Sequence, residues 1–181
     1  EGGYNGTYCY LKNIMGLWII QSIRHELDDR YSYTQLGDLA RRNSTFQAVI
    51  DANDSRFLAP ESMIGAIRDY CRETEQPIPE SPGQLMQCAY RGLARCYAGA
   101  AAELQHITGK KYTSINIVGG GCQDSYLNEM TAAATGLSVF AGPVEGTALG
   151  NLLCQMIQAG EYANLGQARS AIRESFDILP V

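Results

Sequence analysis

The chain has 181 residues, of which 45% are apolar, and its formal net charge is −5. This composition supports a folded core of one domain or slightly more. Because the Lys and Arg residues form no cluster, we expect no nucleic-acid partner, and because no apolar run reaches about 18 residues, we expect no membrane span.

The chain begins Glu-Gly-Gly-Tyr, without an initiator methionine or a signal peptide. We therefore expect an interior cut from a longer, cytoplasmic protein. The six cysteines are scattered without a Cys-x-x-Cys pair, and the two histidines lack the spacing of metal ligands. The sequence predicts no metal site, and mostly buried, reduced thiols.

Residues 9–109 or thereabouts are predicted to be mainly helical. Apolar residues at helical spacing predict one long helix from Tyr10 to Asp29. Asn13 and Gln21 would then lie roughly on one side of this helix, about 12 Å apart along its axis. Further helices are predicted at residues 34–43, beginning at a Thr34 cap, at 60–74 and at 82–108.

A proline-rich turn at residues 76–83 separates the last two of these helices, and Ser81 is placed to cap the second one. Cys71 lies a few residues before the turn and Cys88 a few residues after it. In an antiparallel helix hairpin such positions can face each other, and a disulfide can form where the Cα atoms come within about 7 Å. A pair of reduced core thiols is the alternative.

The second part of the chain predicts a β-α-β-α core at about residues 114–160, with parallel strands. A strand at 114–118 leads through three glycines to a helix at 123–135, which Gly136 ends. A second strand follows at 137–140 and a helix at 147–159. A short helix at 167–175 is predicted to close the chain.

The three consecutive glycines are the strongest functional signal. Gly119, Gly120 and Gly121 have no side chains, so the atoms of a ligand can approach the main chain. The helix that begins near Gln123 offers free N–H groups and a positive dipole end, which suit a phosphate or a ribose. The alternatives are a plain strand-to-helix turn and a dinucleotide-binding fold, which is disfavoured because the glycines are consecutive and not spaced.

Two segments around these glycines are similar to a known family. The run Ile-Val-Gly-Gly-Gly-Cys-Gln-Asp-Ser-Tyr-Leu-Asn and the later Ala-Gly-Pro-Val-Glu-Gly-Thr-Ala-Leu-Gly-Asn resemble the C-terminal signature of the FGGY carbohydrate kinases. The opening Glu-Gly-Gly-Tyr, Leu-Lys-Asn-Ile-Met-Gly-Leu-Trp-Ile-Ile-Gln, Asp-Ser-Arg-Phe and Cys-Arg-Glu-Thr-Glu-Gln-Pro-Ile-Pro-Glu-Ser resemble the members that act on L-rhamnulose. The resemblance runs from residue 1 to about residue 176.

The resemblance implies an α/β fold, the ribonuclease H-like (actin-like ATPase) C-terminal domain, with a partial sheet and a large helical component. It implies transfer of the ATP γ-phosphate to O1 of L-rhamnulose, with Mg²⁺, in L-rhamnose catabolism. Nucleotide contacts would come from Gly119, Gly120 and Gly121, above all the latter two through their backbone, from Ser125 and from Gln21; Asn13 would contact the sugar.

The phosphate-binding loop, the catalytic aspartate and the Ser-Gly-Thr segment of the family are not found in this chain. We therefore expect the chain alone to be inactive and to need a missing N-terminal domain as its partner. An incomplete sheet with an open edge predicts self-association or binding of that partner. The alternatives are a non-catalytic nucleotide-binding module of the actin-like ATPase superfamily, or a kinase for a related deoxyketose such as L-fuculose.

Overall fold

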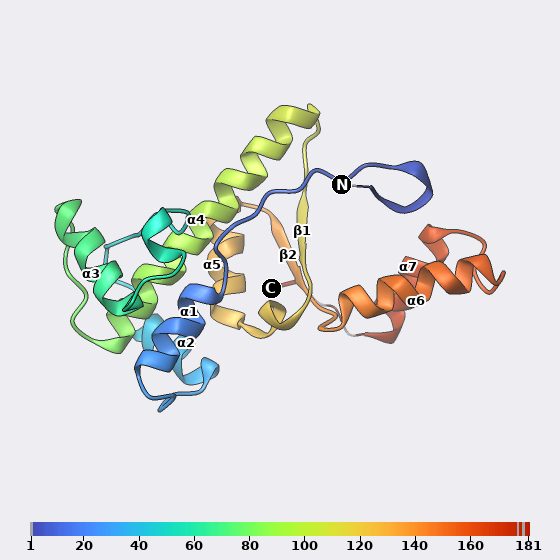
Figure 1. Ribbon diagram of the computed structural model, residues 1–181. Helices are drawn as coiled ribbons and strands as arrows, with labels where there is room; N and C mark the ends of the chain where they lie inside the picture. Colours follow the sequence, from blue (N-terminus) through green and yellow to red (C-terminus); the bar gives the residue numbers. More distant parts are fainter. Residues whose placement is uncertain (1, 177, 179) are drawn as a thin grey trace. The chain divides into compact units, whose positions relative to one another are not determined.

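The structure is a computed structural model that describes residues 2–176, 178, 180 and 181 (Figure 1). The chain forms two units. Unit 1 comprises the residues up to Leu11, Tyr112–Gln123 and the chain from Leu137 onward, and unit 2 comprises Lys12–Lys111 and Asp124–Gly136. Within the described ranges, no helix is long and apolar enough to cross a membrane.

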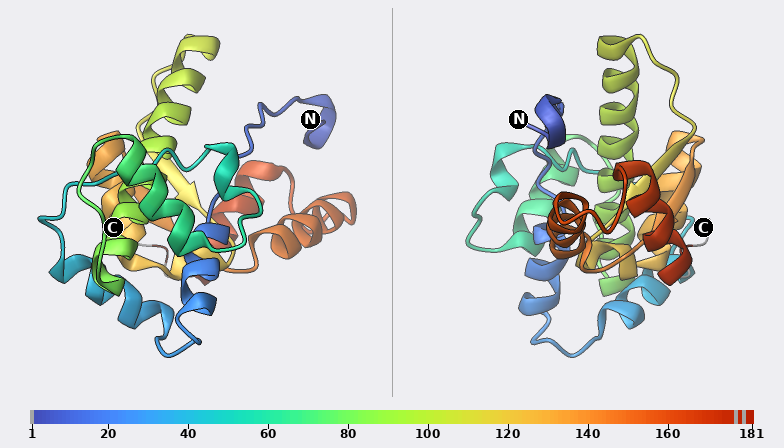
Figure 2. Two further views of the ribbon diagram at one scale, coloured as in Figure 1. Left: turned by 60° about the vertical axis from the view of Figure 1, so that its left-hand side comes forward. Right: turned by 90° about the vertical axis from the view of Figure 1, so that its right-hand side faces the viewer.

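Unit 2 is helical, and its longest helix, α4, packs most extensively against α2 and α5 (Figures 1 and 2). Its elements are α1 (Trp18–Glu26), α2 (Tyr33–Arg42), the 3-10 helix η2 (Ser55–Phe57), α3 (Met63–Glu73), α4 (Pro82–Thr108) and α5 (Ser125–Thr135). The ends of α4 confirm the sequence prediction: Ser81 and Gln84 form a capping box at its start, and Gly109 ends it in the left-handed conformation.

The core of unit 2 is built from apolar side chains that these helices bury against one another. Burying one such side chain contributes about 1.5–3 kcal/mol. Fully buried members include Ile19, Ile20, Ile23, Leu36, Met63, Ile67, Leu85, Met86, Tyr90 and Leu93. A close backbone contact lies beside this core, because a Cβ added to Gly92 of α4 would come within 2.7 Å of Ile50 Cγ1 and of the Ile50 carbonyl oxygen.

The predicted helix from Tyr10 to Asp29 is wrong at both ends. Gly16 has a φ of +61° and Asp28 a φ of 55°, both in the left-handed region that a right-handed helix cannot include. Helix α1 therefore lies between them. Asn13 is outside this helix, so its predicted alignment with Gln21 on one helix is wrong as well.

Two other helix starts differ from the prediction, because neighbouring serines provide the caps. The side chain of Ser32, not Thr34, accepts a hydrogen bond from the Gln35 backbone N–H in a capping box and starts α2. Helix α3 begins at Met63, three residues later than predicted, because Ser62 accepts from the Gly65 N–H. The cap is thus the last residue whose backbone is still extended.

Unit 1 contains the parallel strands β1 (Ser114–Ile117) and β2 (Ser138–Ala141), which confirms the predicted parallel pairing. They pair in register from Ser114 opposite Ser138 to Ile117 opposite Ala141. The unit also contains the 3-10 helices η1 (Tyr4–Gly6) and η3 (Gly120–Gln123) and the helices α6 (Gly146–Gln158) and α7 (Leu165–Ser175). The described chain is therefore α/β, with a small parallel sheet and a large helical part.

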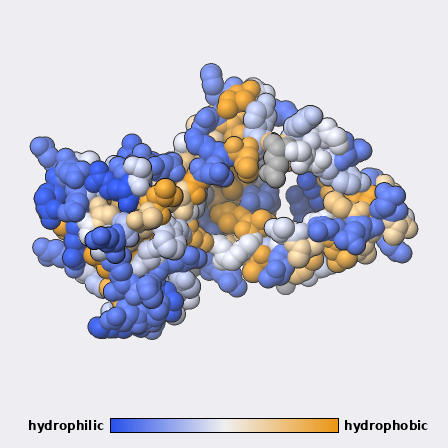
Figure 3. Space-filling view, in the orientation of Figure 1, coloured by the Kyte–Doolittle hydropathy of each residue, from blue (hydrophilic) through white to orange (hydrophobic). Residues whose placement is uncertain are grey.

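Helices α6 and α7 lie side by side (Figures 1 and 2). Helix α6 is apolar along much of its length, yet Leu153 is its one buried residue among those described, and Leu152 is 51% exposed. Apolar residues are accordingly visible on the surface of this helix pair (Figure 3). Much of this apolar surface is therefore left uncovered within unit 1.

Cys71 of α3 and Cys88 of α4 face each other in the core, as the helix-hairpin prediction requires. Both are fully buried free thiols, and their Sγ atoms lie 3.9 Å apart. The hydrogen bond between them lowers the pKa of Cys71, and the same bond together with burial raises the pKa of Cys88. The structure contains the reduced pair, and the disulfide stays a prediction.

Gly92→Ala should destabilise the chain by about 1–3 kcal/mol, because the new methyl group would overlap Ile50. Gly99→Ala on the same helix is the matched control, since a Cβ there meets no atom within 4 Å. It should stabilise the chain by about 0.5–1 kcal/mol through helix propensity. Urea unfolding measures both. Equal changes in the two variants would show that Ile50 does not pack against Gly92.

Oxidised glutathione should convert Cys71 and Cys88 into a disulfide, because their sulfur atoms need to approach by only about 2 Å. Intact mass spectrometry should then show a loss of about 2 Da that reductant reverses. In the Cys88→Ala control no such loss should occur. An unchanged mass after prolonged oxidation of the original chain would exclude the bridge.

Candidate functional site

The glycine turn, residues 119–123, follows β1 directly. Gly119 has a φ of +82°, which favours glycine, and its carbonyl accepts a hydrogen bond of 3.1 Å from the Cys122 N–H. Gly120 is exposed, and a Cβ placed on it would meet no atom within 4 Å. The space beside this backbone is therefore open, so a ligand could approach the main chain.

A second loop, residues 142–145, follows β2 and contacts the glycine turn. The Gly142 N–H donates to the Ile117 carbonyl at 2.7 Å, and the Gly119 N–H donates to the Pro143 carbonyl at 3.3 Å. The two loops thus share the carboxyl edge of a parallel sheet, where α/β proteins bind their ligands. The sequence prediction gave no role to this loop.

The start of α5 comes directly after the glycine turn. Asp124 caps this helix, since its Oδ1 accepts a hydrogen bond of 3.1 Å from the Leu127 N–H. Its Oδ2 accepts a bond of 2.6 Å from the Tyr90 hydroxyl of α4. Burial, and then the Asp124 carboxylate, raise the pKa of Tyr90, which keeps the hydroxyl protonated. Ser125 is exposed as the first residue of α5.

Asp124 and Tyr90 were both missed by the sequence prediction. An aspartate just before a helix is a recognisable cap signal, so Asp124 could have been found. Tyr90 carries no such signal, because its partner lies 34 residues away in the sequence.

Gln21 lies on the exposed side of α1, opposite the buried Ile19 and Ile23. The end of this helix is held by Glu26, whose carboxylate accepts a 2.7 Å bond from the Ser62 hydroxyl and a second bond from a backbone N–H at the start of α3. A carboxylate at a helix N-terminus is favoured by the helix dipole. The helix that presents Gln21 is thereby fixed to α3.

Asn13 is exposed in the irregular segment that precedes α1. Its neighbour Lys12 forms an ion pair with Glu103 of α4, and each side chain of this pair is about half exposed. Surface pairs of this kind contribute little, about 0–1 kcal/mol. The Asn13 amide is therefore accessible, and a weak surface contact is what holds its neighbour.

The predicted site residues are divided between the two units. Asn13, Gln21 and Ser125 belong to unit 2, where Asn13 precedes α1, Gln21 lies on α1 and Ser125 begins α5, and the three glycines belong to unit 1. The two groups are joined through the bond between Gln123 and Asp124. The predicted ligand contacts of all these residues stay predictions. Cys71 and Cys88 lie in the core of unit 2, on α3 and α4, and neither helix contains a predicted ligand contact.

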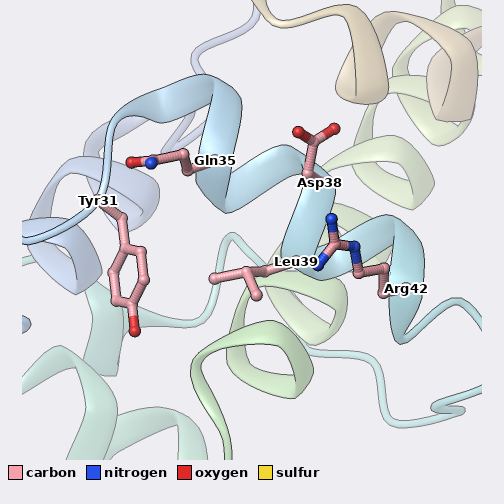
Figure 4. A pocket seen from close by; sticks show the side chains of 5 residues that line it. All are labelled: Tyr31, Gln35, Asp38, Leu39 and Arg42. Atoms are coloured by element: carbon pink, nitrogen blue, oxygen red, sulfur yellow. The ribbon is translucent and has the colours of Figure 1, made fainter.

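A pocket of about 240 Å³ lies along α2 in unit 2 (Figure 4). Tyr31 lines it from the loop before α2, and the helix itself contributes Gln35, Asp38, Leu39 and Arg42. None of the predicted ligand contacts lines this pocket. Across the described ranges, no group of three or more His, Cys, Asp or Glu residues is arranged to hold a metal ion.

Comparison with known proteins gives a consistent result. Residues 1–159 match the C-terminal domain of the FGGY family of carbohydrate kinases. Over 178 residues the chain is 48% identical to the rhamnulokinase of Lactiplantibacillus plantarum. This match covers 98% of this chain and 36% of that protein. The rhamnulokinases of Halalkalibacterium halodurans and Bacillus subtilis are each 47% identical over 98% of this chain, and 38% and 37% of their own lengths are covered.

The chain spans little more than a third of the length of the curated relatives that it matches. The match nevertheless covers almost all of this chain, including the glycine turn, the loop at 142–145 and the start of α5. The chain belongs to the FGGY family of carbohydrate kinases, to whose C-terminal domain it corresponds.

Proposed function

We propose that this chain is the nucleotide-binding part of an ATP-dependent kinase that converts L-rhamnulose to L-rhamnulose 1-phosphate in L-rhamnose catabolism. The observation that carries the proposal is the open glycine turn at the carboxyl edge of the parallel sheet, in a chain 47–48% identical to proteins named rhamnulokinase. The finer fold assignment, the ribonuclease H-like (actin-like ATPase) fold, belongs to the same proposal and is supported by the family match.

The open backbone at Gly120, and Gly121 beside it, would hold the adenine nucleotide through main-chain contacts. Ser125 is exposed at the start of α5, where its hydroxyl could reach the adenosine, and Gln21 is an exposed amide available to the nucleotide. Asn13 would contact the sugar with its exposed amide. Bound with the nucleotide, Mg²⁺ would neutralise charge on the phosphates.

The work of this chain is to position the nucleotide. Phosphoryl transfer depends on aligning the acceptor hydroxyl with the γ-phosphate and on stabilising the charge that develops. We assign neither a catalytic base nor a phosphate-binding loop within this chain. These groups would come from the rest of a longer protein, the predicted N-terminal partner.

The edge of the sheet offers a place for such a partner. Among the described residues β1 pairs with β2 alone, whereas the other edge of β2 is partly covered, since the Val181 N–H donates to the Val139 carbonyl at 2.9 Å. An open strand edge readily pairs with another strand. We propose that the free edge of β1 receives a strand of the remaining protein; a strand of a second copy of this chain is the alternative.

The purified 181-residue chain should show no ATP-dependent phosphorylation of L-rhamnulose above background in a coupled ADP-release assay. A longer protein that contains this chain should phosphorylate L-rhamnulose faster than L-fuculose. Activity of the 181-residue chain by itself would contradict our proposal that the catalytic base and the phosphate-binding loop lie outside this chain. A longer protein that binds ATP without phosphorylating either sugar would favour the alternative, a non-catalytic nucleotide-binding module.

Gly120→Ala should weaken ATP binding by about tenfold or more, because the new methyl group would occupy space that the ligand needs. Stability should change by less than about 0.5 kcal/mol, since that methyl group meets no protein atom. Gly150→Ala in α6 is the matched control in the same unit, because a Cβ there also meets nothing within 4 Å. Its affinity for ATP should equal that of the original chain.

Isothermal calorimetry measures both variants, with NAD as a second ligand. An unchanged ATP affinity in Gly120→Ala would remove the glycine turn from the nucleotide site. Tighter binding of NAD than of ATP would favour the dinucleotide-binding alternative.

A further inference from the structure

The Tyr90–Asp124 hydrogen bond joins the middle of α4 to the residue that follows the glycine turn. Tyr90 is fully buried, and its hydroxyl donates to Asp124 Oδ2 over 2.6 Å. A buried hydroxyl without a partner is costly, so both groups gain from this bond. The bond is charge-assisted because the acceptor is a carboxylate, which makes it shorter and stronger than a neutral one.

Both carboxylate oxygens of Asp124 are in use. Oδ1 accepts from the Leu127 N–H and so caps α5, while Oδ2 accepts from Tyr90. The side chain therefore fastens the first turn of α5 to α4 on one side and completes that turn on the other. Ser125, the proposed nucleotide contact, is the next residue, so a shift of Asp124 would move the backbone of Ser125 as well.

A second tyrosine makes a comparable contact between the same two helices. Tyr126 packs edge-on against the Tyr90 ring, with ring centroids 5.6 Å apart and an interplanar angle of 89°. Its hydroxyl donates to Gln87 Oε1 of α4 at 2.9 Å. This bond ties α5 to α4 without involving Asp124. Comparing the two tyrosines therefore distinguishes the general packing of α5 on α4 from the hydrogen bond to the capping residue.

We propose that Tyr90 is a positioning residue for nucleotide binding: through Asp124 it sets the place of Ser125 and of the first turn of α5. This inference rests on the proposed function. In this proposal Tyr90 does not contact the nucleotide, and it acts only through its hydrogen bond to Asp124. Loss of the Tyr90 hydroxyl frees the carboxylate to turn toward water, which loosens the first turn of α5.

The test compares Tyr90→Phe with Tyr126→Phe in the full 181-residue chain, using two readouts. Hydrogen–deuterium exchange of the amides at residues 123–127, without ligand, measures how firmly the start of α5 is held. In Tyr90→Phe it should become faster by about tenfold, and in Tyr126→Phe by less than about twofold. ATP titration by calorimetry should show a rise in Kd of about fivefold or more for Tyr90→Phe and almost none for Tyr126→Phe.

Asp124→Ser provides the second arm, because serine still caps a helix but is too short to keep both bonds. If Tyr90 acts through Asp124, adding Tyr90→Phe to Asp124→Ser should change neither readout further. Equal effects of the two Phe variants, or additive effects in the double variant, would overturn the inference.

A chain that binds no ATP at all would count against the proposed function, whereas the exchange readout would still decide whether Tyr90 holds the start of α5. Unchanged exchange in Tyr90→Phe would overturn the inference even if the original chain bound ATP normally.

Discussion

The burial of α4 is the constraint on which the rest of unit 2 depends. Leu85, Met86, Tyr90 and Leu93 along this helix are at most 2% exposed, and α1, α2 and α5 each pack against it. Removing apolar surface from water is the dominant favourable term in folding. Because α5 is held on α4 by this packing, the helix start at Ser125 has a fixed place within the unit.

The candidate site contains little side-chain chemistry. In unit 1 it consists of backbone: a left-handed Gly119, an open Gly120, and a second loop bonded to the turn through the Pro143 carbonyl. Backbone N–H groups at such a turn recognise phosphate and ribose without a charged side chain. The polar side chains, Asn13, Gln21 and Ser125, are all exposed in unit 2. This division suits a family whose catalysis relies on positioning.

The error in the first predicted helix has a local cause. Apolar spacing predicted a helix from Tyr10 onward, but spacing does not report the backbone angle at Gly16. Because Gly16 is left-handed, α1 begins only after it, and Asn13 lies outside the helix. Before this glycine, Met15 packs against the core, whereas Leu11 is 70% exposed although it fits the same apolar spacing. The Tyr90–Asp124 bond was invisible for a different reason, since nothing local to either residue indicates the other.

The sequence by itself determined the features that depend on near neighbours. These include the Ser81 cap and the stops at Gly109 and Gly136. Hydrogen bonds within a few residues decide such features, so they can be read locally. The sequence also determined membership of the family, because the match rests on the order of residues along the chain. Only the tertiary structure decided that Cys71 meets Cys88, that the glycine turn contacts Pro143, and that Tyr90 reaches Asp124. Each of these contacts depends on the sum of many weak packing interactions between distant segments, and no short stretch of sequence contains that sum.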